Sequence, residues 1–218
     1  MSSLILDEIL RNKYSKRYQI NKDVITGGGT DWTNDPFELD MAKLTAVAYS
    51  NNRMSFNGYK YIEEFSTAET AVYQKNDTVY ISFRGTSNLK DVVTDVKLIK
   101  GEERTTNRFQ KSYKLAQDFK AKGFKVVVVG HSMGATIGFT IGERDPTIEV
   151  YGFNIGSTPN IMRCIGRCPN IHLFNTSTDF ASVLTRPIKK LTKMTIKTIP
   201  SKYPFYKIAS NHSVANFF

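Results

Sequence analysis

The chain has 218 residues, of which 40% are hydrophobic, and its formal net charge is +10. This length provides one sizeable hydrophobic core but is short for two, and the composition indicates a globular fold. No apolar run reaches the roughly 20 residues that span a bilayer, and the first ten residues lack the basic flank and the cleavage site of a secretory signal. The sequence therefore predicts a protein that works inside the cell, in the cytoplasm.

Residues 1–33 are expected to form an N-terminal arm, and residues 34–218 the main domain. The arm combines a short helical pattern over residues 4–18 with three consecutive glycines, Gly27 to Gly29, which are typical of a flexible joint. Beyond the arm, Asp35 and Pro36 form a helix-start signal, and the apolar spacing that follows predicts a helix over residues 36–49. This helix is expected to cover one face of a sheet.

From residue 59 the pattern changes to that of β-strands. Strands are predicted over residues 59–65, 69–74 and 78–83, and the tight turn between the last two makes them antiparallel. Helices and strands then alternate, with a helix over 106–122, a strand over 125–129, a helix over 133–142 and strands over 148–154 and 171–174. This order predicts an α/β fold of the α/β-hydrolase type, in which a mostly parallel sheet has an antiparallel N-terminal part and helices on both faces.

Four consecutive valines in the strand over residues 125–129 lead into Gly130-His131-Ser132-Met133-Gly134. Gly-x-Ser-x-Gly between a buried strand and a helix is typical of a nucleophile elbow. The serine occupies a strained corner, and a β-carbon at either glycine would collide with neighbouring backbone. The corner aims the Ser132 hydroxyl at a helix N-terminus, where free N–H groups can receive negative charge. Ser132 is thus the predicted nucleophile.

A serine nucleophile needs a general base, usually a histidine that is held by a carboxylate. In this type of fold the acid and then the histidine follow the serine along the chain. His131 lies inside the elbow and His172 precedes the best acid, which leaves His212. Asp179 follows the C-terminal end of a predicted strand, where open α/β sheets carry their sites. Ser132, Asp179 and His212 are therefore the predicted catalytic residues.

The negative charge that develops during acyl transfer also needs hydrogen-bond donors. The backbone N–H of Met133, the residue after the nucleophile, is one predicted donor. The second is Thr86, which can offer its N–H and its hydroxyl at the end of the strand over residues 78–83. Gly85 lets the chain turn tightly just before it.

Several motifs together resemble the class 3 lipase family, which comprises the fungal-type triacylglycerol lipases and their phospholipase A1 relatives. They are Phe83-Arg84-Gly85-Thr86, the segment from Asp91 to Asp95, the Gly-His-Ser-Met-Gly elbow, a late aspartate and a C-terminal histidine. The resemblance covers about residues 36–218. It implies an α/β-hydrolase that cleaves carboxylic esters of lipids through an acyl-enzyme, with Ser132, Asp179 and His212 as its triad and Thr86 and Met133 as its oxyanion hole. It implies no cofactor.

The resemblance also implies a lid after the oxyanion residue. Four apolar residues recur there at helical spacing: Leu89, Val92, Val93 and Val96. A helix with this apolar face could lie over the site in water and turn toward a lipid surface. An ordinary helix packed on the sheet would show the same pattern, so both interpretations stay open.

The two cysteines, Cys164 and Cys168, are too few for a disulfide framework and are expected to be ordinary thiols in a reducing compartment. With His172 they form C-x3-C-x3-H, a spacing that suggests zinc. A structural zinc site wants four ligands, however, and no fourth candidate lies nearby. No metal is therefore predicted.

Positive charge gathers near the C-terminus. Asp179 is the last acidic residue, and seven basic residues follow it: Arg186, Lys189, Lys190, Lys193, Lys197, Lys202 and Lys207. Such a segment attracts an anionic membrane surface, or it is a solvated face that aids solubility. Nucleic acid is not expected, because no groove-reading or base-stacking motif accompanies the charge.

Two other functions stay open from the sequence. One is a catalytically idle lipase-fold protein that binds anionic membranes or serves a structural role. The other is a soluble esterase for small esters that is indifferent to lipid interfaces. The sequence does not predict an oligomeric state.

Overall fold

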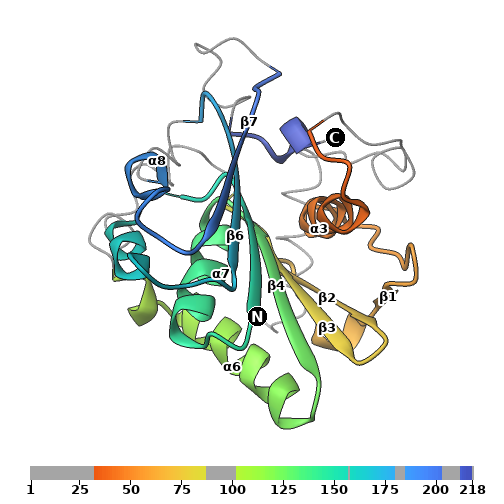
Figure 1. Cartoon of the computed structure of the whole chain (residues 1–218). Coiled ribbons are helices and arrows are strands. Elements are labelled where there is room, and N and C mark those ends of the chain that lie inside the picture. Colours follow the sequence, from red (N-terminus) through yellow and green to blue (C-terminus); the bar gives the residue numbers. More distant parts are fainter. Residues whose placement is uncertain (1–31, 87–101, 157, 180–184, 203–211, 218) are drawn as a thin grey trace.

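The computed structural model describes residues 32–86, 102–156, 158–179, 185–202 and 212–217. The arm expected over residues 1–33 lies outside these ranges except for its last two residues. The lid expected at Leu89, Val92, Val93 and Val96 lies outside them entirely. In the described part, one central sheet carries helices on both of its faces (Figure 1).

The strand order in the sheet follows the order along the chain, from β1 to β7. The strands are β1 Lys60–Tyr61, β2 Thr70–Lys75, β3 Thr78–Phe83, β4 Lys125–His131, β5 Glu149–Phe153, β6 Ile171–Thr176 and β7 Thr195–Ile199. β1, β2 and β3 pair antiparallel, whereas each pairing from β3 to β7 is parallel. The predicted fold class, a mostly parallel sheet with an antiparallel N-terminal part, is therefore confirmed.

Helices connect and cover the strands. They are α3 Pro36–Val47, η1 Glu63–Phe65, η2 Glu103–Thr105, α6 Asn107–Ala121, α7 Met133–Arg144, η3 Pro159–Cys164, α8 Thr185–Ile188 and η4 Val214–Phe217. α6 and α7 lie on one face of the sheet and α3 lies on the other (Figure 1). α3 begins where the sequence predicts, because the Asp35 carboxylate accepts from the N–H of Phe37 and Pro36 occupies the first turn.

The valine run of β4 supplies both hydrophobic cores, because successive strand side chains point to opposite faces. Val126 and Val128 belong to the cluster under α6 and α7. Val127 and Val129 belong to the cluster under α3. A strand that is buried on both faces needs an apolar residue at every position, which explains four consecutive valines.

One predicted strand is largely wrong, and one observed strand was not predicted. The strand expected over residues 59–65 is only two residues long, and its second half forms the 3-10 helix η1. The backbone N–H of Ile62 still donates to the carbonyl of Val72, but beyond it the Ser66 hydroxyl donates to the carbonyl of Ile62 and accepts from the N–H of Val72. The sequence analysis also contained no strand at Thr195–Ile199, which pairs with β6 as β7.

The prediction of two free thiols is wrong, because Cys164 and Cys168 form a disulfide. The turn between them contains Gly166 at a positive φ of 67°, and it brings the two Cα atoms to 5.4 Å. The disulfide removes the cysteine-based argument for a reducing compartment. It also removes both thiolates from the C-x3-C-x3-H pattern, and His172 instead contacts Glu149 on the neighbouring strand.

No group of three or more His, Cys, Asp or Glu side chains in the described ranges could hold a metal ion. No helix in them is both long and apolar enough to cross a membrane.

Candidate active site

Ser132 lies at the sharp turn between β4 and α7, with φ 56° and ψ −124°. Such a conformation is strained for a residue with a β-carbon. The turn depends on close backbone contact on both sides of the serine. A β-carbon on Gly134 would lie 2.0 Å from the carbonyl oxygen of Phe83, and one on Gly130 would lie 2.5 Å from the carbonyl carbon of Gly134. The collisions predicted for the two glycines are confirmed.

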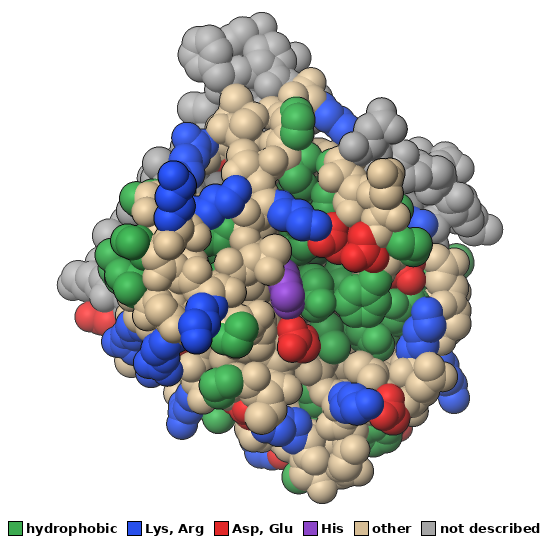
Figure 2. Space-filling view, viewed as in Figure 1, with side chains coloured by type: hydrophobic (Ala, Val, Ile, Leu, Met, Phe, Trp, Pro, Cys, Tyr) green, Lys and Arg blue, Asp and Glu red, His purple; other side chains and the backbone are tan. Residues whose placement is uncertain are grey.

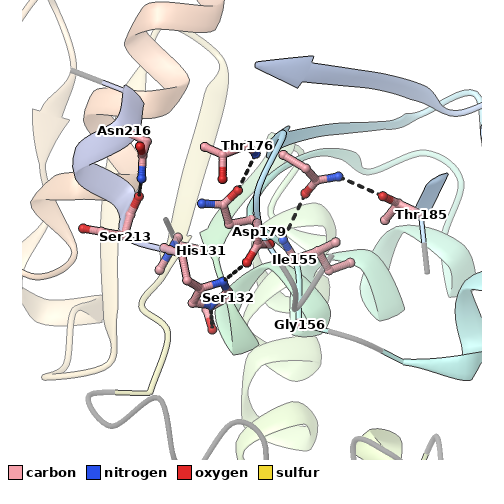
Figure 3. A network of polar contacts seen from close by, with 12 residues as sticks. His131, Ser132, Ile155, Gly156, Thr176, Asp179, Thr185, Ser213 and Asn216 are labelled. Carbon is pink, nitrogen blue, oxygen red and sulfur yellow. Dashed lines mark hydrogen bonds and ion pairs between the residues drawn. The ribbon is translucent and has the colours of Figure 1, made fainter. Parts of the chain in front are cut away.

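The structure brings Ser132, His212 and Asp179 into one hydrogen-bonded row (Figure 3). His212 Nε2 lies 2.7 Å from Ser132 Oγ, and His212 Nδ1 lies 2.8 Å from Asp179 Oδ1. The side chains come from the turn after β4, the loop after β6 and the segment before η4. Their exposed fractions are 2%, 1% and 0% in the order Ser132, His212 and Asp179.

The direction of these hydrogen bonds follows from the chemistry of the partners. An ionised carboxylate can only accept, so Nδ1 of His212 carries the hydrogen that faces Asp179. In the neutral ring Nε2 is then the acceptor, and the Ser132 hydroxyl donates to it. This tautomer is the one in which the imidazole can take the serine proton.

Two buried asparagines fix the loop that carries Asp179, and sequence reasoning missed both. Asn154, just after β5, accepts from the N–H of Thr176 at 2.8 Å. Asn175, near the end of β6, accepts from the N–H of Ile155 at 3.3 Å and donates to the hydroxyl of Thr185 at 3.1 Å. Figure 3 shows Thr176, Ile155 and Thr185 around Asp179 in this network. The available signal was an asparagine at the C-terminal end of two adjacent apolar strands.

The segment that carries His212 is held by its own turn. Asn216, in η4, donates through its side chain to the carbonyl of Ser213 at 3.0 Å, and both residues are labelled in Figure 3. The carbonyl of Phe217 accepts from the indole N–H of Trp32 at 3.2 Å. The chain end is therefore tied to the core next to α3.

Both predicted oxyanion donors are adjacent to the elbow. Gly85 packs against it so closely that a β-carbon there would lie 2.8 Å from Ser132 Cβ. The next residue, Thr86, has a buried hydroxyl oxygen that lacks a hydrogen-bond partner in the described part of the chain. Met133 is the first residue of α7, so its N–H lies outside the bonding of the helix itself.

Arg108, at the start of α6, connects the two donor segments. One terminal nitrogen donates to the carbonyl of Arg84, the residue before Gly85, and the other lies 3.4 Å from the Met133 sulfur. Glu69 lies 3.5 Å from Nε and balances the charge. The sequence analysis assigned no role to Arg108.

His131, which the sequence analysis rejected as the base, lies behind the row instead. Its Nδ1 is 2.6 Å from the hydroxyl of Tyr49, and its Nε2 is 2.6 Å from the carbonyl oxygen of His212. Burial, reinforced by the neighbouring His212, lowers the pKa of His131 to about 3. The ring is therefore neutral near neutral pH.

No protein-family model matches the sequence, and no curated protein is significantly similar to it. The solved structures that are similar to it include the following two. Lipase II from Rhizopus niveus has 14% identity and a TM-score of 0.44, over 99% of this chain and 94% of that chain. A predicted CIB-like hydrolase from Thermoplasma acidophilum has 14% identity and a TM-score of 0.43, over 74% of this chain and 92% of that chain. At these values neither protein assigns a role to any residue here.

The sheet topology and the elbow define the class of the protein as an α/β-hydrolase-type fold.

Proposed function

We propose that this protein is a serine hydrolase that cleaves carboxylic esters. The observation that carries the proposal is the row of Ser132, His212 and Asp179 at a strained strand-to-helix turn. His212 Nε2 takes the proton of Ser132 as the hydroxyl oxygen attacks an acyl carbonyl. Asp179 holds the ring in its tautomer and stabilises the imidazolium that forms.

The attack places negative charge on the former carbonyl oxygen. The N–H of Met133 and the N–H and hydroxyl of Thr86 receive it, at a helix N-terminus that favours negative charge. When the tetrahedral intermediate collapses, the alcohol leaves with the proton from His212 and the acyl group stays on Ser132. Water, activated by His212, then attacks the acyl-enzyme and releases the acid.

We further propose that the substrate is a lipid ester, as for a triacylglycerol lipase or a phospholipase A1. The motif resemblance to class 3 lipases supports this substrate. The basic C-terminal segment supports a peripheral contact with an anionic membrane, because its described cations are exposed. Figure 2 shows Lys and Arg side chains gathered around the region of α8 and β7. Opposite charge draws such a face to anionic headgroups.

Labelling with a fluorophosphonate tests the nucleophile. We expect the wild type and Ser55→Ala, which removes an exposed serine far along the chain from the elbow, to be labelled. Ser132→Ala should not be labelled, because the probe phosphonylates an activated serine. A folded wild type without Ser132-dependent labelling would favour the catalytically idle alternative and overturn the proposal.

Hydrolysis of short-chain esters below and above their aggregation limit tests the lipid substrate. A jump in rate once aggregates form would support a lipase or phospholipase. Rates that follow only the dissolved ester would point to the soluble esterase. Co-sedimentation of Ser132→Ala with anionic and with neutral vesicles separates membrane contact from turnover.

A further inference from the structure

Tyr49 and His131 lie behind the proposed catalytic machinery and touch two of its parts. Tyr49 follows the C-terminal end of α3, and His131 is the last residue of β4. Both side chains are buried. The ring of His131 lies between those of Tyr49 and His212, at centroid distances of 5.8 Å and 5.1 Å.

Three hydrogen bonds connect these residues, and each has one possible direction. The carbonyl oxygen of His212 can only accept, so His131 Nε2, at 2.6 Å, carries the hydrogen. In the neutral ring Nδ1 is then an acceptor, and the Tyr49 hydroxyl donates to it at 2.6 Å. The Tyr49 oxygen in turn accepts from the N–H of Gly85 at 2.8 Å. Together these three hydrogen bonds form a relay that runs from the Gly85 N–H through Tyr49 and His131 to the carbonyl oxygen of His212.

The relay requires an uncharged His131. A second ring hydrogen would lie on Nδ1, facing Tyr49, and His131 could no longer accept from the tyrosine hydroxyl. Burial keeps the ring neutral, since it lowers the pKa of His131 to about 3; the charge of the His212 ring acts in the same direction, whereas the hydrogen bond to the His212 carbonyl and the charge of Asp179 oppose it. The hydrogen-bond directions therefore stay the same near neutral pH.

Gly85 packs closely against this relay and against the elbow. A β-carbon on it would lie 2.7 Å from Tyr49 Oη, 2.8 Å from the carbonyl oxygen of His131 and 2.8 Å from Ser132 Cβ. The segment that carries Thr86 is thus packed against Tyr49 and against the elbow. An error of about 1 Å in such a position can cost a hundredfold in rate.

We propose that Tyr49 and His131 are positioning residues that hold the Gly85–Thr86 turn and the backbone of His212 in one fixed arrangement around Ser132. The relay sets the oxyanion donor and the general base together, without either residue contacting the reacting atoms. This inference rests on the proposed function. The protonated nitrogen of His131, which can be observed without turnover, tests the relay itself.

Tyr49→Phe removes only the hydroxyl, and p-nitrophenyl butyrate serves as the test ester. We expect kcat to fall about tenfold, the effect of one lost hydrogen bond in the transition state, while KM changes less than about twofold. Tyr73→Phe is the matched control, because the buried Tyr73 hydroxyl has no hydrogen-bond partner within the described ranges. A kcat for Tyr49→Phe within about twofold of wild type would overturn the inference.

A double-mutant cycle with His131→Leu tests the connection between the two residues. Leucine is apolar and can neither donate to the carbonyl of His212 nor accept from the hydroxyl of Tyr49. The double variant should therefore lose little beyond the larger single loss. Losses that multiply would show that the two side chains act separately, against the relay.

Nitrogen NMR of the histidine rings tests the relay without turnover. The chain has only three histidines, so their signals can be assigned by substitution. We expect His131 in the Nε2–H form, with Nδ1 unprotonated from about pH 5 to about pH 8, in both wild type and Ser132→Ala. An Nδ1–H form would overturn the relay even if the enzyme is active. An inactive wild type with the Nε2–H form would instead count only against the proposed function. The measurement on the wild type also decides the matter if a variant fails to fold.

Discussion

At Asp179 the difference between a carboxylate and an amide decides which nitrogen of His212 carries the hydrogen. The carboxylate accepts from Nδ1–H and leaves Nε2 free to accept from Ser132. An asparagine at this position can turn its NH2 group toward Nδ1, which favours the tautomer that cannot take the serine proton.

Asp179→Asn should therefore lower kcat on the order of 10³-fold or more while KM changes little. Steady-state kinetics on p-nitrophenyl butyrate and the rate of fluorophosphonate labelling measure the effect. Glu149→Gln is the control, because its carboxylate contacts His172 near the N-terminal ends of β5 and β6, at the opposite end of these strands from Asp179, and should leave kcat unchanged. A loss below about tenfold for Asp179→Asn would contradict its proposed role.

At the scale of elements, Asp145 fastens the end of α7 to α6. Its carboxylate accepts from Lys120 and, at 2.9 Å, from Gln117, both on α6, and from the hydroxyl of Thr147 at 2.6 Å. Burial by itself would raise the pKa of Asp145. The Lys120, Thr147 and Gln117 contacts outweigh it and hold the pKa far below the ordinary value of 3.8.

A carboxyl group whose pKa is lower in the folded state than in the unfolded state stabilises the fold at pH values above the unfolded-state pKa. This stabilisation is lost as the pH falls toward the folded-state pKa. Asp145→Asn should reduce the free energy of unfolding by about 1–2 kcal/mol at pH 7, and the difference from wild type should shrink as the pH falls below about 4. Urea unfolding at several pH values measures both effects. Asp118→Asn, which breaks an exposed pair with Lys114, should cost only a few tenths of a kcal/mol. If the difference in unfolding free energy between Asp145→Asn and wild type is the same at all pH values, the lowered pKa of Asp145 is contradicted.

At the scale of the whole molecule, an aromatic cluster packs the first described residue, Trp32, against the last, Phe217. Trp32, Phe153, Phe174 and Phe217 meet at centroid distances between 4.9 Å and 6.4 Å. Phe217 is fully buried, and its segment carries His212. Packing at the chain end therefore holds the proposed general base in place.

Phe217→Ala should lower the free energy of unfolding by about 3–5 kcal/mol, because it leaves a cavity in the core. It should also lower kcat, since His212 loses its support. Trp32 is the only tryptophan in the chain, so a red shift of intrinsic fluorescence reports the loosened cluster. Phe37→Ala, at a ring that is 38% exposed, should cost much less. Equal losses of unfolding free energy in Phe217→Ala and Phe37→Ala would contradict the proposed stabilising role of Phe217.

Much of the architecture was predictable, because its signals are local. The cap at Asp35 and the valine run leave clear patterns, and the antiparallel hairpin and the parallel strands beyond it lie where those patterns indicate. β7 escaped prediction because it is a short edge strand in which two consecutive residues, Lys197 and Thr198, are exposed, and this interrupts the alternation typical of a half-buried strand. The two cysteines were misjudged because the turn at Gly166, rather than their number, brings them together.

For the candidate site, the sequence by itself determined the elbow and, because the chain has so few histidines, the residues to consider as its partners. Only the tertiary structure decided that His212 meets Ser132 and Asp179, which lie 80 and 33 positions away along the chain. Only the tertiary structure also places Tyr49 and His131 next to these residues. The physical reason is that a backbone turn is set by neighbouring residues, whereas a hydrogen bond between distant side chains depends on how the strands and the chain end pack together.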